Sequence, residues 1–198
     1  AEEGTGIGGR ITDRDLVEGG APGYGEDFEV KKLSNVRKLI AQGMYNSLQN
    51  SAQLTHHMSA DARYILALRK VVKKKLEEGS FSENITLNDM VCYAVIKALK
   101  KHPDANVHFM GDSIRAYRKI HLGFAVDTER GLLVPVVRNA DDLKLEGLSS
   151  RLKALAEKAK KGNIEPELIN SESATFTVSN LGAYGVEMFT PVLNVPQV

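Results

Sequence analysis

Three hydroxyl side chains recur at alternate positions near the end of the chain, at Thr175, Thr177 and Ser179. Alternate residues of an extended strand point to the same face, so this face is unusually rich in hydroxyl groups. A hydroxyl can donate a hydrogen bond to the oxyanion that forms when an acyl group is attacked. A hydroxyl-bearing face is also common on solvated strands, and the pattern alone leaves both interpretations open.

Two other residue spacings are weaker evidence for a functional site. His57 and Asp61 pair a possible base with a carboxylate, but residues four apart in a strand lie about 13 Å from each other. We therefore interpret this pair as structural or surface-exposed. Gly4-x-Gly6-x-x-Gly9 matches a dinucleotide-binding fingerprint by letter, yet that site needs a strand before it and a full helix after it. We interpret these glycines as a turn.

The composition argues against several classes of protein. The 198 residues carry 26 basic and 25 acidic side chains, a balance that does not favour a nucleic-acid binder. The single cysteine excludes an internal disulfide, and no histidine stands at a metal-ligand spacing from it. No apolar run approaches the roughly 18–20 residues of a membrane span. We expect no metal, nucleic acid or membrane among its partners.

The elements that must position these residues alternate between helix and strand patterns. Apolar residues at helical spacing predict helices over 34–50, 65–76, 87–101 and 142–161. Alternating patterns predict strands over 53–59, 174–179 and 186–193, and strands with turns over 105–138. Thr86-x-x-Asp89 predicts a capping box, and Pro135 indicates an edge strand or a bulge. This mixed order predicts an α+β or mixed α/β fold.

The predicted helices each have one apolar face. In the first helix this face holds Val36, Ile40, Met44 and Leu48, and in the second it holds Ile65, Leu68, Val72 and Leu76. The opposite face of the second helix is basic, with Lys70, Lys73 and Lys74. Cys92 stands inside an apolar helix, so we expect it in the core.

The region before Phe28 has a different character. Residues 1–18 form a small glycine-rich unit that is too short to bury a core alone. Residues 19–27 hold four glycines and one proline, which is typical of a linker. The chain begins at Ala1 and shows no signal peptide, and we interpret it as a piece of a longer polypeptide.

Three stretches resemble the dihydrolipoamide acyltransferase component of the 2-oxo acid dehydrogenase complexes. They are Gly4 to Asp15, His121 to Asn139, and Thr175 to Gly182 followed by Phe189 to Pro196. The first is similar to half of the family's peripheral-subunit-binding domain. The resemblance implies a remnant of that domain over 1–18, a linker over 19–27 and an acyltransferase catalytic domain over 28–198 that lacks its C-terminal part.

The resemblance also implies an architecture and a setting. The fold is expected to be like that of chloramphenicol acetyltransferase, a mixed sheet flanked by helices. By this resemblance, the chain is expected to form homotrimers that build a larger hollow core of cubic or icosahedral symmetry. The expected partners of this core are a 2-oxo acid dehydrogenase and a dihydrolipoamide dehydrogenase. The lipoyl group is carried on a separate upstream domain. The expected compartment is the cytoplasm, or the mitochondrial matrix in a eukaryote.

The implied reaction moves an acyl group between the dihydrolipoyl thiol and coenzyme A. In the matching stretch Ser179 occupies the position of the family's oxyanion donor. Arg69 matches an arginine that can contact a phosphate of coenzyme A, and a solvated helix face is an equally good interpretation of it. Ser179 to Gly182 resembles acetyl or branched-chain enzymes, and Phe124 with Asp127-Thr128 favours acetyl. An acetoin-cleaving complex would use the same transfer.

The family's general base is a histidine in a His-x-x-x-Asp-Gly motif, which is absent from these 198 residues. His57-x-x-x-Asp61 is followed by Ala62 and does not replace it. We therefore expect the 198-residue chain to be inactive by itself. The alternative function is a core-forming scaffold subunit without catalysis.

Overall fold

The structure is a computed structural model that describes residues 8–9 and 29–198. The chain divides into two units, 1–34 and 35–198, and the second contains all the helices and strands described below. The predicted domain remnant over 1–18 and the linker over 19–27 lie outside the described residues, apart from Gly8 and Gly9.

The first two helices form where their apolar spacing predicts them. Helix α2 spans Asn35–Asn50 and α3 spans Arg63–Glu77. In α2 the buried position near the end is Ser47, whereas Leu48, predicted on the packed face, is 56% exposed. Steps of four residues exceed the helical repeat of 3.6, so three such steps carry the stripe away from the core. Residue 47, one position earlier, therefore faces the core in place of residue 48.

Two predicted strands are wrong. Residues 51–62 and 186–193 contain no strand. The side chain of Gln53 accepts a hydrogen bond from the backbone N–H of Leu193 at 3.3 Å, so these two segments meet through a side chain. An alternating pattern forms a strand only where a neighbouring strand offers its backbone groups, and neither segment pairs with one among the described residues.

The strands form three small sheets. Strand β1 (Val107–Phe109) pairs antiparallel with β2 (Ile114–Ala116), and β4 (Val126–Thr128) pairs antiparallel with β5 (Gly131–Leu133). In the third sheet, the central strand is β3 (Leu122–Phe124). It pairs antiparallel with β6 (Val136–Val137) and parallel with β7 (Phe176–Val178). Pro135 separates β5 from the edge strand β6, in agreement with the prediction.

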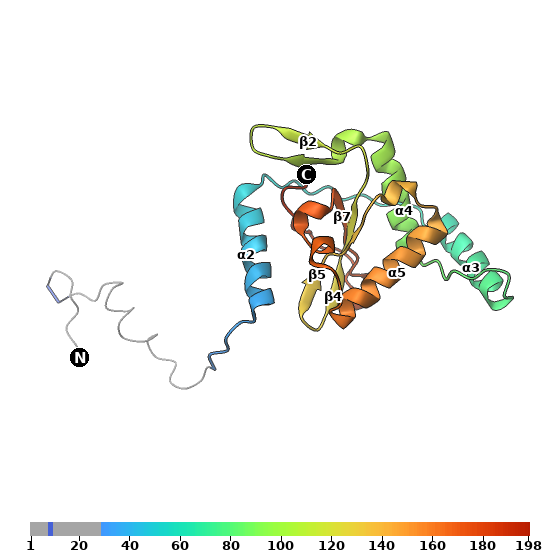
Figure 1. Cartoon of the computed structure of the whole chain (residues 1–198), viewed down its shortest axis with the longest axis horizontal. Helices are drawn as coiled ribbons and strands as arrows, with labels where there is room; N and C mark the ends of the chain where they lie inside the picture. The colour runs from blue at the N-terminus through green and yellow to red at the C-terminus, as the bar shows by residue number, and fades with distance from the viewer. Residues whose placement is uncertain (1–7, 10–28) are drawn as a thin grey trace. The chain divides into compact units, whose positions relative to one another are not determined.

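The core lies between the third sheet and two helices, α4 (Leu87–Lys101) and α5 (Leu145–Lys161). Figure 1 shows α4 and α5 together on one side of the strands, with α2 beside β5. The predicted capping box begins α4, and the buried Asp89 carboxylate also accepts a hydrogen bond from Ser149 of α5 at 2.8 Å. Short 3-10 helices complete the chain at Pro103–Ala105, Ala140–Asp142, Pro166–Leu168, Ser171–Ser173 and Gly182–Tyr184.

This mixed helix and sheet architecture confirms the predicted fold class. None of the helices in the described part of the chain is both long and apolar enough to cross a membrane. For the site, the decisive element is β7, because the chain leaves the buried sheet there and passes directly into an exposed segment.

Candidate active site

The three hydroxyls near β7 have three different environments. Thr175 is fully buried, and its Oγ1 accepts a hydrogen bond from the backbone N–H of His121 at 3.0 Å. Thr177 is half-buried and bonds to two amide side chains of the segment that follows. Ser179 is exposed, and its hydroxyl makes no hydrogen bond with any residue that the structure describes. Only Ser179 therefore has a hydroxyl available for a ligand.

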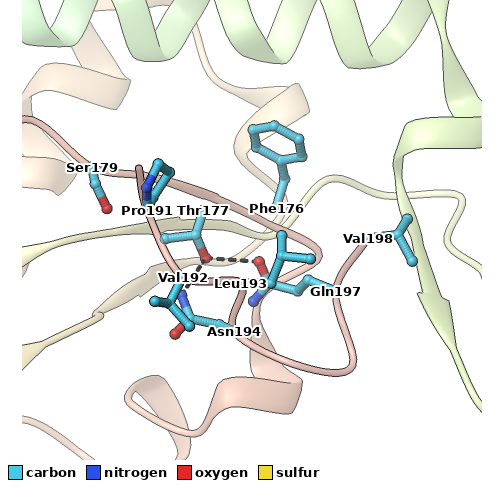
Figure 2. A pocket seen from close by; sticks show the side chains of 9 residues that line it. All are labelled: Phe176, Thr177, Ser179, Pro191, Val192, Leu193, Asn194, Gln197 and Val198. Carbon is cyan, nitrogen blue, oxygen red and sulfur yellow. Dashed lines mark hydrogen bonds between the residues drawn. The ribbon is translucent and has the colours of Figure 1, made fainter. Parts of the chain in front are cut away.

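Ser179 lines two cavities that share several residues. The smaller has a volume of about 90 Å³ and the larger about 740 Å³. Figure 2 shows Thr177 and Ser179 near the segment that carries Pro191 and Asn194. The wall of the larger cavity is mostly apolar and includes Leu39, Ile40 and Met44 of α2, Leu132 and Leu133 of β5, and Phe189. A cavity of this size and character suits a small organic group.

The segment after Ser179 is tied down at both ends. The side-chain amide of Asn180 donates to Oδ1 of Asn88, on the first turn of α4, at 3.1 Å. Its carbonyl oxygen accepts from the backbone N–H of Gly182 at 2.9 Å. The hydroxyl of Tyr184 donates to Asp127 of β4 at 2.8 Å, and this bond raises the pKa of Tyr184. These contacts fix the backbone on the C-terminal side of Ser179.

Arg69 lies on the packed side of α3, beside Ile65 and Val72 and away from the exposed face. Leu68, which the sequence places on the packed face, is 47% exposed, because residue 69 lies closer to the centre of that stripe. Nη1 of Arg69 is buried and has no hydrogen-bond partner among the described residues. Arg69 lines neither cavity around Ser179.

The other candidate groups are not at this site. The carboxylate of Asp61 bonds to Arg63, which lowers the pKa of Asp61, and His57 is exposed. Cys92 is fully buried, and burial, with a smaller contribution from the charge of Asp89, raises its pKa to about 12. All five histidines lie in the described part of the chain, and none lines either cavity. The described residues hold no group of three or more potential metal ligands.

The chain was compared with models of known protein families. Residues 25–198 match the model of the 2-oxoacid dehydrogenases acyltransferase family, catalytic domain. The chain belongs to this family. The match confirms the family predicted from the three sequence stretches.

Related acyltransferases agree in sequence and in fold. The acetyltransferase component of the acetoin-cleaving system of Bacillus subtilis is 37% identical over 203 residues, which cover 98% of this chain and 50% of that protein. A dihydrolipoamide acetyltransferase of Azotobacter vinelandii, investigated for the catalytic role of a serine, a histidine and an asparagine, is 32% identical. Its structure superposes with a TM-score of 0.80, covering 86% of this chain and 70% of that one.

A third relative is a multimer. The cubic core of a pyruvate dehydrogenase multienzyme complex is 33% identical and has a TM-score of 0.81, covering 88% of this chain and 71% of that one. The chain spans about half or less of the length of the curated relatives that it matches.

The sequence patterns did not indicate the amide side chains near Ser179. Asn194 and Gln197 lie seventeen and twenty positions from Thr177, and no spacing rule connects them with β7. Asn180 is adjacent to Ser179 in sequence, but its partner Asn88 is 92 positions away. The one signal that could have indicated the first two is their place inside or next to the matching stretch that ends at Pro196.

Proposed function

We propose that this chain takes part in the transfer of an acyl group, of the acetyl type, between dihydrolipoamide and coenzyme A. The observation that carries the proposal is the Ser179 hydroxyl, which faces a largely apolar cavity and makes no hydrogen bond within the described residues. The names of the bacterial relatives, both acetyltransferases, support the acetyl group. The lipoyl group would be carried on a separate domain, as the resemblance implies.

The step at Ser179 follows from thioester chemistry. A thiolate attacks the thioester carbonyl, the carbonyl oxygen becomes an oxyanion, and the departing thiolate leaves when the tetrahedral intermediate collapses. A hydroxyl that donates to that oxyanion lowers the barrier. Ser179 can be this donor because its hydroxyl makes no hydrogen bond with any described residue. No titratable side chain lines the cavities in the described part of the chain, so a base must come from elsewhere.

The test reduces the need for a base. At about pH 9 a far larger fraction of an ordinary thiol is ionised than near neutral pH, so attack on a thioester depends less on a general base and more on substrate binding and oxyanion stabilisation. We expect the 198-residue chain to accelerate acetyl exchange between acetyl-dihydrolipoamide and coenzyme A under these conditions. Ser179→Ala should lower the protein-dependent rate about a hundred- to a thousandfold. Ser80→Ala, which alters an exposed serine, is the control.

The outcomes are distinct. A rate that Ser179→Ala leaves unchanged would refute the role of this serine. A wild-type chain that gives no rate above the uncatalysed exchange at about pH 9 would favour the alternative, a core-forming scaffold without catalysis. Near neutral pH we expect the 198-residue chain to be inactive by itself, because these residues do not include the His-x-x-x-Asp-Gly motif.

Coenzyme A contact remains a proposal for Arg69. Its half-buried position and the buried Nη1, which has no hydrogen-bond partner among the described residues, support a guanidinium held in place with donors still available to a phosphate. Arg69→Met should weaken coenzyme A binding by about ten- to a hundredfold, the range of a charged hydrogen bond. Lys70→Met, on the exposed face of the same helix, is the matched control. Equal affinities of the two variants in calorimetric titrations would contradict this role.

Assembly into homotrimers and a larger core is likewise proposed for this chain. Large apolar side chains are exposed on α2 and α3, at Leu39, Tyr45, Leu48, Tyr64, Leu68 and Val71. Exposed apolar patches mark association surfaces, and one relative is the cubic core of a multienzyme complex. Sedimentation of the purified chain should show trimers or larger species, whereas a purely monomeric chain would contradict this. The 2-oxo acid dehydrogenase and dihydrolipoamide dehydrogenase partners, and a cytoplasmic or matrix location, remain predictions.

A further inference from the structure

The hydroxyl of Thr177 bridges β7 and the segment from Pro191 to Gln197. It donates a hydrogen bond to Oε1 of Gln197 at 2.8 Å and accepts one from Nδ2 of Asn194 at 3.3 Å. Figure 2 shows both bonds meeting at this single oxygen. Because Thr177 precedes Ser179 by two residues, the bridge lies immediately next to the proposed oxyanion donor.

We propose that Thr177 is a positioning residue for Ser179 in the proposed acyl transfer, on which this inference rests. Asn194 and Gln197 line both cavities together with Ser179, so the hydroxyl of Thr177 sets the distance between β7, which the serine follows directly, and the opposite wall. Thr177 lines the smaller cavity, but its hydroxyl is engaged by these two hydrogen bonds. It acts through the two amide side chains and through its own strand.

The opposite wall is also anchored from α2. Ser47 Oγ donates to the backbone carbonyl of Leu193 at 2.6 Å, and Gln53 accepts from the backbone N–H of the same residue at 3.3 Å. Leu193 is therefore held on one side of the segment, and its neighbour Asn194 is held by Thr177 on the other. The wall is fixed at Leu193 by α2 and Gln53. If the hydrogen bonds of Thr177 are lost, β7 can therefore shift relative to this wall, and Ser179 shifts with it.

A small displacement at this point has a large effect on the rate. An oxyanion donor is effective only when its hydrogen-bonding atom lies about 2.7–3.1 Å from the oxyanion. A misplacement of about 1 Å can cost up to about a hundredfold in rate. Thr177→Val keeps the shape of the side chain but removes the hydroxyl, so the amides of Asn194 and Gln197 both lose a partner.

The experiment compares Thr177→Val with Thr177→Ser in the exchange assay at about pH 9, where far more of the attacking thiol is ionised than near neutral pH. We expect Thr177→Val to lower the saturated rate by about tenfold or more, and Thr177→Ser to stay within about twofold of wild type. Thr175→Val is the matched control, because it removes a buried hydroxyl whose hydrogen bonds among the described residues go to the backbone of His121 alone. It should lower the unfolding midpoint and leave the saturated rate unchanged.

Pairing with Ser179→Ala separates positioning from a general structural effect. If Thr177 acts through Ser179, adding Thr177→Val to Ser179→Ala should cause no further loss of rate. A wild-type rate in Thr177→Val, or the same fractional loss in both backgrounds, would overturn the inference. Failure of the proposed function has a different signature, in which Ser179→Ala by itself retains the wild-type rate.

Discussion

Gly123 and Thr177 are direct partners across the parallel pair β3–β7, and a Cβ atom on Gly123 would lie 2.9 Å from Oγ1 of Thr177. The same added atom would lie 3.0 Å from Cβ of Ala174 and 3.1 Å from Cγ1 of Val134. The threonine hydroxyl is tied by its own hydrogen bonds, so it cannot swing aside freely. The glycine therefore provides the space in which the Thr177 bridge forms.

This close approach predicts that Gly123→Ala destabilises the fold. Overpacking in a tight site typically costs about 1–3 kcal/mol of unfolding free energy. Gly43→Ala is the control, because the added atom in α2 would meet nothing within 4 Å. A glycine inside a helix is about 0.5–1 kcal/mol less stable than alanine, so the control should be neutral or stabilising. Denaturant unfolding measures both, and equal stability of the two variants would contradict the steric explanation.

Ser47 predicts a second loss of stability. Its fully buried hydroxyl donates to the carbonyl of Leu193, a residue 146 positions away. Ser47→Ala leaves that carbonyl without this donor and should cost about 1–3 kcal/mol. Ser80→Ala removes a bond to the Lys75 carbonyl in an exposed turn and should change stability by less than about 0.5 kcal/mol. If the two serine variants unfold at the same denaturant concentration, the connection between α2 and Leu193 contributes nothing measurable.

His121 predicts a loss of stability in acid. Burial, with a smaller contribution from Arg138, lowers the pKa of His121, although Asp141 opposes the shift. Its Nδ1 accepts from the backbone N–H of Asn139 at 3.1 Å, which needs the unprotonated nitrogen. The unfolded chain binds this proton first as the pH falls, so the stabilisation is complete above the unfolded pKa. It is lost as the pH falls toward the lower folded value.

The measurement is the unfolding midpoint of wild type and His121→Gln across the range from neutral to about pH 5, which spans the usual histidine pKa. The wild-type midpoint should fall more steeply with acid than that of the variant. Parallel curves would show that another group controls this part of the acid response.

Cys92 predicts an unreactive thiol. Its side chain is fully buried and its pKa is raised to about 12, so almost no thiolate is present near neutral pH. An aromatic disulfide reagent should label Cys92 only after denaturant unfolds the chain. Free coenzyme A, which has an ordinary thiol, should react at once under the same conditions. Rapid labelling of the native protein would mean that the α4–α5 core opens readily.

Much of the fold follows from local patterns, because those patterns report backbone preferences directly. The Thr86–Asp89 capping box, the helical stripe of α5 and the break at Pro135 each depend on residues within a few positions of one another. The wrong strand predictions concern segments whose structure depends on a pairing partner elsewhere in the chain. The segments 53–59 and 186–193 alternate like strands, but side-chain hydrogen bonds such as that of Gln53 replace a strand partner.

The sequence by itself determined the family and the alternation of Thr175, Thr177 and Ser179, because long motifs and a two-residue period can be recognised along the chain, although the strand β7 itself ends one residue before Ser179. Only the tertiary structure decided which hydroxyl is available. Thr175, Thr177 and Ser179 have the same spacing and similar chemistry, but Thr175 bonds the backbone of His121 and Thr177 bonds amides about twenty positions away. Hydrogen-bond partners are set by contacts distant in sequence, and no local pattern specifies them.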